Sequence, residues 1–367
     1  MPADSYQGFV DNLARKDYGT AEADINKAIR LSPDNALFHA SNGLLYFRLV
    51  QTPFRLKQLF GEEINLYPED LNHIESAIQS YKKAILISPN DEGYYHNIGW
   101  LYFFSKDQQH STEYLRNAIA LDSTQPMLHV SLGLIQERYG EKESAYQEYA
   151  YAVRLSPGIV ESPFFSDLKI RMPDQADRIV SSVILDLENK LKQDRSPLLK
   201  AKLGKLYLYK KSLEPAEKFL RESAEEMPGL SRPWLNLGQI FEMQYNEDEM
   251  KRCYEIADYL DSSDSLPAIR LGDFYDRHNQ IPQAVFYYRK GVDRWVEQSS
   301  PHTRQTLRLY KAKVVVSNDI IPEELLYYCN PTFDIAGACL KLSVFYRHNG
   351  NEKLAEHYDG IGKKFSP

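Results

Sequence analysis

The sequence predicts an all-α fold in which antiparallel helix pairs stack into an α-solenoid. Three observations support this prediction. Glycine recurs every 34 residues in the same local frame, and a period of this length is typical of helical repeat arrays. Small and large residues follow each glycine at offsets that suit two packed helices. Proline or a polar residue then closes most units, where a helix has to end.

The first helix of each predicted unit contains the recurring glycine. Gly99 and Gly133 are 34 residues apart, and Gly204, Gly238 and Gly272 repeat this interval. Because glycine has no side chain, it lets a second helix approach closely. One helix pair cannot bury its apolar side alone, so neighbouring pairs must stack to complete the core.

The second helix of each unit follows at fixed offsets. In the unit of Gly133, a small residue comes twelve positions later (Ala145), then a large one (Tyr149), another small one (Ala152) and finally Pro157. We interpret the large residue as the one that fills the space opposite the glycine. Each unit is therefore expected to be a helix–turn–helix.

These landmarks resemble those of the tetratricopeptide repeat, whose unit is a helix–turn–helix of the same length. In this chain the large residue that opens the first helix is Tyr95, His129 or Trp234, and the tyrosine landmark is Tyr102 or Tyr207. The resemblance implies a right-handed superhelix. It also implies that the first helices of successive units line a concave groove in which a partner binds.

The repeat is expected to run through residues 1–367 as a single solenoid of about ten helix pairs. Its first pair has a plain second helix but a degenerate first helix. Two later units are degenerate, at 158–195 and 299–335. At each of these places the next landmark, a glycine or the serine that replaces it, comes only after 71 residues, which leaves room for one unit without the landmark. An insertion, 49–75, separates the two helices of the second unit, because the second helix arrives late.

The insertion has its own apolar pattern. Leu56, Leu59, Phe60 and Ile64 repeat at helical spacing, which predicts that the first helix continues into the insertion before a loop begins. Two interpretations stay open. The insertion either packs on the repeats for structural reasons, or it folds over the mouth of the groove and docks a partner.

Composition narrows the function classes. The chain of 367 residues has a net charge of −7, which argues against nucleic acid as a partner, since such proteins favour a basic surface. No stretch of 18 apolar residues predicts a membrane span. The first residues, Met1–Tyr6, lack the pattern of a secretory signal. We expect a cytoplasmic location for the chain as written, and a periplasmic or membrane-associated one if it is a piece of a larger protein.

The sequence contains no recognisable catalytic motif, phosphate loop or paired metal-binding cysteines. Cys253, Cys329 and Cys339 are an odd number without metal-ligand spacing, and we interpret them as small apolar residues. His348 and His357 fall on different helices of the last unit. We therefore expect no enzymatic activity, no cofactor and no metal site.

Partner-binding candidates follow from the groove that the resemblance implies. Groove-facing positions are expected two residues before each glycine and one, four and five residues after it. In the N-terminal half they give an apolar and aromatic set, which either packs against the insertion and neighbouring helices or anchors an apolar side chain of a partner. These candidates are Phe47, Asn97, Trp100, Phe103 and Phe104.

In the C-terminal half the same face is polar and charged. Lys202, Asn236 and Arg270 share one column on successive units. This ladder suits an extended chain that bears carboxylates, or it is a solvated face of mixed charge. The candidates are Lys202, Lys205, Arg232, Asn236, Gln239, Arg270 and Asp273.

Three functional hypotheses remain. The first is a non-enzymatic scaffold that binds a partner protein or peptide in its concave groove. The second is a soluble module of a larger bacterial envelope glycan-assembly membrane protein, because residues 156–168 resemble segments in the repeat tails of O-antigen ligase-like proteins. The third is an enzyme whose site lies in a degenerate unit.

Overall fold

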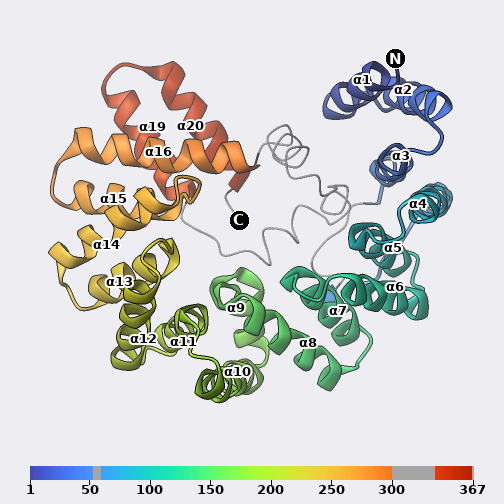
Figure 1. The fold of residues 1–367 in the computed structure, drawn as a ribbon. Helices are drawn as coiled ribbons and strands as arrows, with labels where there is room; N and C mark the ends of the chain where they lie inside the picture. The colour runs from blue at the N-terminus through green and yellow to red at the C-terminus, as the bar shows by residue number, and fades with distance from the viewer. Residues whose placement is uncertain (53–58, 300–334, 366–367) are drawn as a thin grey trace. The chain divides into compact units, whose positions relative to one another are not determined.

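The computed structural model describes residues 1–52, 59–299 and 335–365, and these contain 18 α-helices, the 3-10 helix η2 and no strand (Figure 1). The all-α prediction is confirmed. The chain divides into two compact units. The first comprises Met1–Ser156 with Met172–Gln175, and the second comprises Pro157–Arg171 and the described residues from Ala176 onward. One continuous right-handed solenoid over 1–367 stays a prediction.

The first unit consists of four helix pairs in chain order. Each odd-numbered helix packs on the even-numbered helix that follows it, and each even-numbered helix packs on the next odd-numbered one. This neighbour-by-neighbour packing is that of an α-solenoid. The helices are α1 (Pro2–Ala14), α2 (Tyr18–Leu31), α3 (Ala36–Arg48), α4 (Pro68–Ile87), α5 (Glu92–Phe104), α6 (Gln108–Leu121), α7 (Pro126–Arg138) and α8 (Lys142–Leu155).

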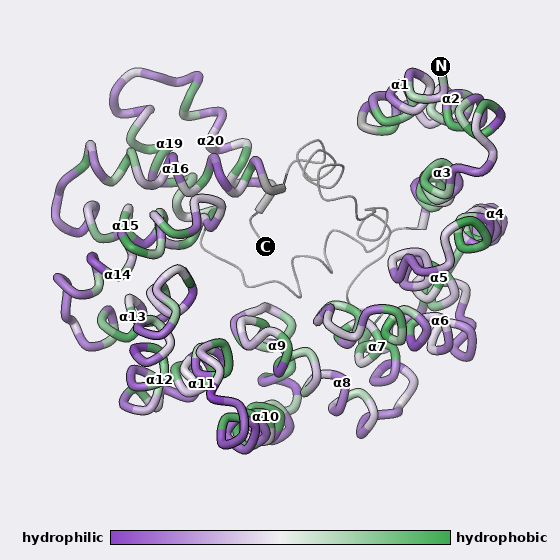
Figure 2. The backbone as a smooth tube through the Cα atoms, in the orientation of Figure 1, coloured by the Kyte–Doolittle hydropathy of each residue, from purple (hydrophilic) through white to green (hydrophobic). Residues whose placement is uncertain are grey.

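From α11 onward the second unit continues the same pattern, and α11 also contacts α13 directly, so the first helices of these consecutive pairs are neighbours. Its elements are η2 (Pro157–Glu161), α9 (Pro163–Arg171), α10 (Pro173–Gln193), α11 (Pro197–Tyr209), α12 (Leu213–Glu226), α13 (Ser231–Met243), α14 (Glu247–Leu260), α15 (Leu266–Arg277), α16 (Ile281–Ser299), α19 (Ile335–His348) and α20 (Glu352–Phe365). Figure 2 shows hydrophobic and hydrophilic residues mixed along the helices.

The recurring glycines mark the closest approach of the two helices in a pair. A Cβ atom added at Gly238 would lie 2.4 Å from Cε1 of Tyr254, and one at Gly204 would lie 2.5 Å from Cγ of Leu220. Both distances are far below van der Waals contact. The predicted roles of the glycine and of the large residue opposite it are thus confirmed.

The turns inside the pairs share one backbone feature. Lys106, Lys211, Tyr245 and Asn279 each have a positive φ, between 54° and 64°, directly after the first helix. A residue in this left-handed region ends a helix and lets the chain reverse. Glycine occupies the same place at Gly140.

The insertion differs from the prediction. α3 ends at Arg48 and α4 already begins at Pro68, so the first helix does not continue into the insertion. The prolongation was therefore a wrong prediction, although Leu59 and Ile64 are buried, with 1% and 5% of their surface exposed. Neither residue lies in an α-helix, and Leu56 lies outside the described residues.

Asp70, in the first turn of α4, holds the described ends of this insertion together. Its side chain is completely buried and accepts hydrogen bonds from the backbone N–H groups of Gln51 (2.7 Å), Thr52 (3.1 Å) and Tyr67 (3.2 Å). The Thr52 hydroxyl donates a further bond. Burial raises the pKa of Asp70, but these hydrogen bonds outweigh it and leave the pKa below its usual value.

The degenerate unit at 158–195 is helical, as the apolar stripe predicted. It consists of η2, the short α9 and the long α10, on which Val180, Val183 and Leu187 are buried. The other degenerate unit, 299–335, lies outside the described residues apart from its two ends, as does Cys329. The first helix of the first pair, expected to be degenerate, is a regular helix that buries Phe9.

Candidate partner-binding faces

The aromatic candidates of the first unit lie on α3 and α5. Trp100, Phe103 and Phe104 are buried, with 0%, 1% and 5% of their surface exposed, and Asn97 is fully buried. Phe47 is half-buried and stacks on Phe104, with ring centroids 5.6 Å apart. Of the two interpretations of this set, the geometry favours packing over an anchor for a partner.

A buried polar network accompanies these rings. Trp100 Nε1 donates to His96 Nε2 over 3.2 Å, and Ser131 Oγ lies 2.9 Å from the same nitrogen. Burial lowers the pKa of His96 to about 4, so its ring is neutral at pH 7. The ring therefore acts as a structural acceptor that ties α5 to α7.

The polar candidates of the second unit centre on Lys205 of α11. Its residue surface is only 8% exposed, yet its Nζ donates to Gln239 Oε1 on α13 (3.2 Å) and forms an ion pair with Glu161 at the end of η2. Burial lowers the pKa of Lys205, the Glu161 carboxylate opposes that shift, and the charges of Arg232 and Arg270 add to it. The structure thus brings these candidates together.

The remaining candidates of this face have carboxylate neighbours as well. Arg232, whose side chain is 63% exposed, lies 3.4 Å from the buried Asp264. Arg270 lies 4.0 Å from Asp273, whose Oδ1 also accepts from Lys341 over 3.0 Å. The charges are therefore mixed rather than purely cationic. Lys202 is partly buried on α11, and Asn236 is buried on α13.

Sequence reasoning missed one coupling between the two helices of a pair. The hydroxyl of Tyr149 donates to Glu137 over 2.7 Å, and that of Tyr254 donates to Glu242 over 2.9 Å. In both pairs the tyrosine stands opposite the glycine and the glutamate stands four residues after it. The recurrence of tyrosine with an acid at these two positions is a signal that could have found the coupling.

Sequence reasoning also missed Glu161. This residue precedes Lys205 by 44 positions and belongs to η2, so no repeat spacing connects the two. The only sequence signal near it was the stretch 156–168, which we interpreted as a resemblance to repeat tails. In the structure Phe164, Phe165 and Leu168 of this stretch are completely buried, so packing explains its apolar residues.

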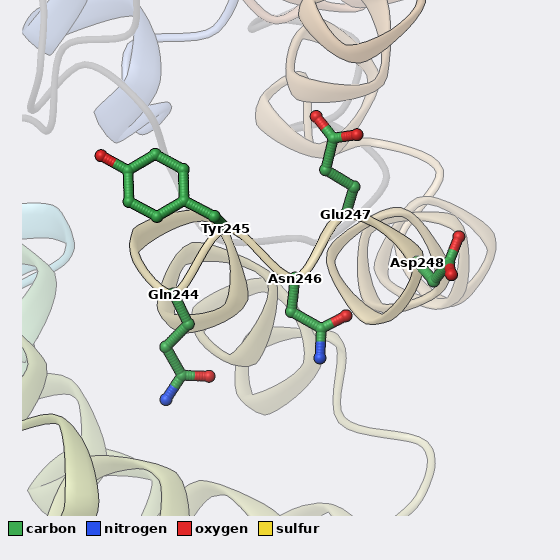
Figure 3. A pocket seen from close by; sticks show the side chains of 5 residues that line it. All are labelled: Gln244, Tyr245, Asn246, Glu247 and Asp248. Carbon is green, nitrogen blue, oxygen red and sulfur yellow. The ribbon is translucent and has the colours of Figure 1, made fainter.

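A hollow of about 520 Å³ lies over the turn between α13 and α14, lined by residues 244–248. Figure 3 shows that Gln244 and Asn246 point to one side of this turn and Tyr245 and Glu247 to the other, and Tyr245 is 91% exposed. The hollow is therefore open surface rather than an enclosed site. Within the described ranges no group of three His, Cys, Asp or Glu side chains is placed to hold a metal ion, and no helix is long and apolar enough to cross a membrane.

Comparison with known proteins identifies the repeat. The sequence model of the tetratricopeptide repeat family matches residues 65–91 and 93–125, which contain α4, α6 and all of α5 except its first residue. The chain is 26% identical over 159 residues to the BBSome complex member BBS4 of Xenopus tropicalis. That alignment covers 40% of this chain and only 31% of the length of the relative.

Several solved structures are also similar. A crystal structure of MamA protein is 16% identical, with a TM-score of 0.35, and the match covers 61% of this chain and 90% of that one. Pseudomonas aeruginosa PilF is 14% identical, with a TM-score of 0.33, and the match covers 71% and 91%. We base the assignment on the family match and on the landmarks. Residues 65–91 and 93–125 are thus identified as tetratricopeptide repeats, and the same glycine landmarks and pairing of helices recur in both units.

Proposed function

We propose that this protein is a non-enzymatic scaffold that binds a segment of a partner protein along the first helices of its second unit. Tetratricopeptide repeat proteins generally serve as protein-interaction scaffolds rather than catalysts. The face formed by α11, α13 and α15 is the part we propose for docking, in the concave groove that the repeat implies. The proposal concerns a protein or peptide partner.

One observation supports the second unit over the first. Its first-helix face presents polar groups to solvent, including the 63% exposed side chain of Arg232 and the 37% exposed side chain of Arg270. In the first unit the corresponding Trp100 and Phe103 are buried. Removing a buried aromatic side chain costs about 3–5 kcal/mol, so Trp100→Ala would report on stability rather than on docking.

The partner segment that fits this face is extended and acidic. Arg232 and Arg270 lie on successive first helices, α13 and α15, and the charges of both lower the pKa of Lys205 on α11. Carboxylates spaced along an extended peptide would meet these cations in turn. The carboxylates already on the face compete with those of the peptide for the same cations. Because salt screens the attraction between exposed charges, the affinity should fall as the salt concentration rises.

The proposal is tested by panning a displayed random peptide library on the immobilised wild-type protein. We expect acidic sequences to be enriched. Arg232→Gln/Arg270→Gln should weaken the enriched peptides on the order of tenfold, equivalent to about 1.4 kcal/mol. Isothermal titration calorimetry measures the change, and circular dichroism confirms that the variant is folded.

A matched control removes two positive charges from second helices of the same unit. Lys218 on α12 and Arg252 on α14 are exposed, so Lys218→Gln/Arg252→Gln changes the net charge equally. We expect this variant to bind like wild type. If both double variants bind the enriched peptides with equal affinity, the result contradicts the proposed docking face.

The two other functional hypotheses gain no support from the described residues. The stretch 156–168 folds into η2 and α9 and packs its apolar residues inside the second unit. This packing accounts for the residues that suggested a glycan-assembly protein. We therefore propose neither that alternative nor an enzyme in the degenerate unit.

A further inference from the structure

Lys205 is the most deeply buried cation on the proposed docking face. Its ammonium has two described partners, the carboxylate of Glu161 and the amide oxygen of Gln239. A buried ammonium requires a counter-charge, because burial without one strongly favours the neutral form. Glu161 supplies that charge here, and it comes from outside the regular repeat.

The two members of this ion pair differ in how they are held. The Lys205 side chain is 10% exposed and lies within α11, whereas the Glu161 side chain is 37% exposed. Glu161 is the last residue of η2, a five-residue 3-10 helix. Such helices are short and have poorer hydrogen-bond geometry than α-helices. Moving the Glu161 side chain out of the ion pair and into water therefore costs less free energy than moving the Lys205 side chain.

The proposed docking face contains further donors for an anion on α13 and α15. Arg270 Nε is buried and has no hydrogen-bond partner among the described residues, although its guanidinium lies 4.0 Å from Asp273. Asn236, 5% exposed, precedes Arg270 by one repeat in the same column. A guanidinium nitrogen that has no hydrogen-bond partner among the described residues favours a carboxylate acceptor.

From this geometry we propose that Glu161 occupies the place of a partner carboxylate at Lys205, so that the chain partly blocks its own docking face. The inference rests on the proposed function, since it concerns the same acidic partner segment. A carboxylate of the partner displaces Glu161 and takes over its ion pair with Lys205. Glu161 then turns to solvent, which its exposed side chain allows.

The test measures binding of a fluorescein-labelled hexaglutamate peptide with blocked termini, by fluorescence anisotropy. The same label on hexaglutamine serves as the peptide control. Glu161→Gln removes the competing charge and keeps the shape of the side chain. If Glu161 occupies the site about 90% of the time, its removal raises the affinity on the order of tenfold. Lys205→Gln is expected to weaken binding below the wild-type level.

A second variant keeps the test valid if Glu161→Gln folds poorly because it leaves Lys205 without a counter-charge. Glu161→Asp preserves the charge but shortens the side chain, so it should raise the affinity to an intermediate level. Thermal melting of each variant reports on folding. From the highest affinity to the lowest, the expected order is Glu161→Gln, Glu161→Asp, wild type and Lys205→Gln.

The outcomes separate this inference from the proposed function. If hexaglutamate binds wild type, and Arg232→Gln/Arg270→Gln weakens this binding, the result supports the proposed docking face. Unchanged or weaker binding by both Glu161 variants would then overturn the self-blocking role alone. If hexaglutamate binds neither wild type nor the Glu161 variants, the inference is overturned, while the peptide panning decides the proposed function separately.

Discussion

Gly238 and its counterparts set the distance between the two helices of a pair. The added Cβ at 2.4 Å from the Tyr254 ring shows that even a methyl group has no room. The ring itself cannot withdraw, because its hydroxyl is bonded to Glu242. A helical glycine normally weakens a helix by about 1 kcal/mol relative to alanine, so it is retained here for packing.

We predict that Gly238→Ala destabilises the protein by about 1–3 kcal/mol through overpacking, despite its better helix propensity. Gly360→Ala is the matched control, since Gly360 is exposed on α20 with nothing within 4 Å of an added Cβ. The control should be neutral or stabilising by up to about 1 kcal/mol. Urea unfolding followed by circular dichroism measures both. Equal midpoints for the two variants would contradict the packing role of Gly238.

At the scale of elements, α4 anchors the insertion through a single carboxylate. Asp70 accepts hydrogen bonds from both described ends of that segment, so one side chain replaces the short turn found in the other pairs. The anchor also explains why α3 stops at Arg48. The N–H groups of Leu49 and Val50 still donate to carbonyls of α3, whereas those of Gln51 and Thr52 bond to Asp70 instead of continuing the helix.

We predict that Asp70→Asn lowers the free energy of unfolding by about 1–3 kcal/mol at pH 7, because buried N–H donors lose a charged acceptor. The pKa of Asp70 is lowered by folding, so its stabilisation is complete above its unfolded pKa of about 3.9 and is lost as pH falls through the lower folded value. Chemical unfolding from pH 7 to pH 2 measures this.

The difference between wild type and Asp70→Asn should therefore shrink in acid. Glu69→Gln is the matched control, since Glu69 is an exposed neighbour in the same helical turn. It should unfold like wild type throughout. A difference between wild type and Asp70→Asn that stays constant down to pH 2 would contradict the role of the Asp70 charge.

At the scale of the whole molecule, α19 and α20 complete an apolar cluster of the second unit. α19 packs on α16, and one apolar cluster combines Tyr288 and Val292 of α16 with Cys339 and Leu342 of α19. Without α19 and α20, this side of α16 would face water. End pairs shield the core of a repeat array and are needed for its solubility.

We predict that deletion of residues 336–367 promotes self-association, because it exposes the cluster around Tyr288 and Val292. Size-exclusion chromatography with light scattering measures the molar mass, and binding of a hydrophobic dye reports the exposed surface. A monomeric truncated protein that melts as sharply as the full chain would contradict this prediction.

The helix pairs and their spacing follow from the order of amino acids, because a pair is a local structure. Gly99, Gly238 and the large residues opposite them are close in the chain, and their offsets alone predict the packing. The burial of Trp100 and the ion pair of Lys205 with Glu161 were not predictable in this way. They depend on contacts between different pairs, whose geometry no single repeat contains.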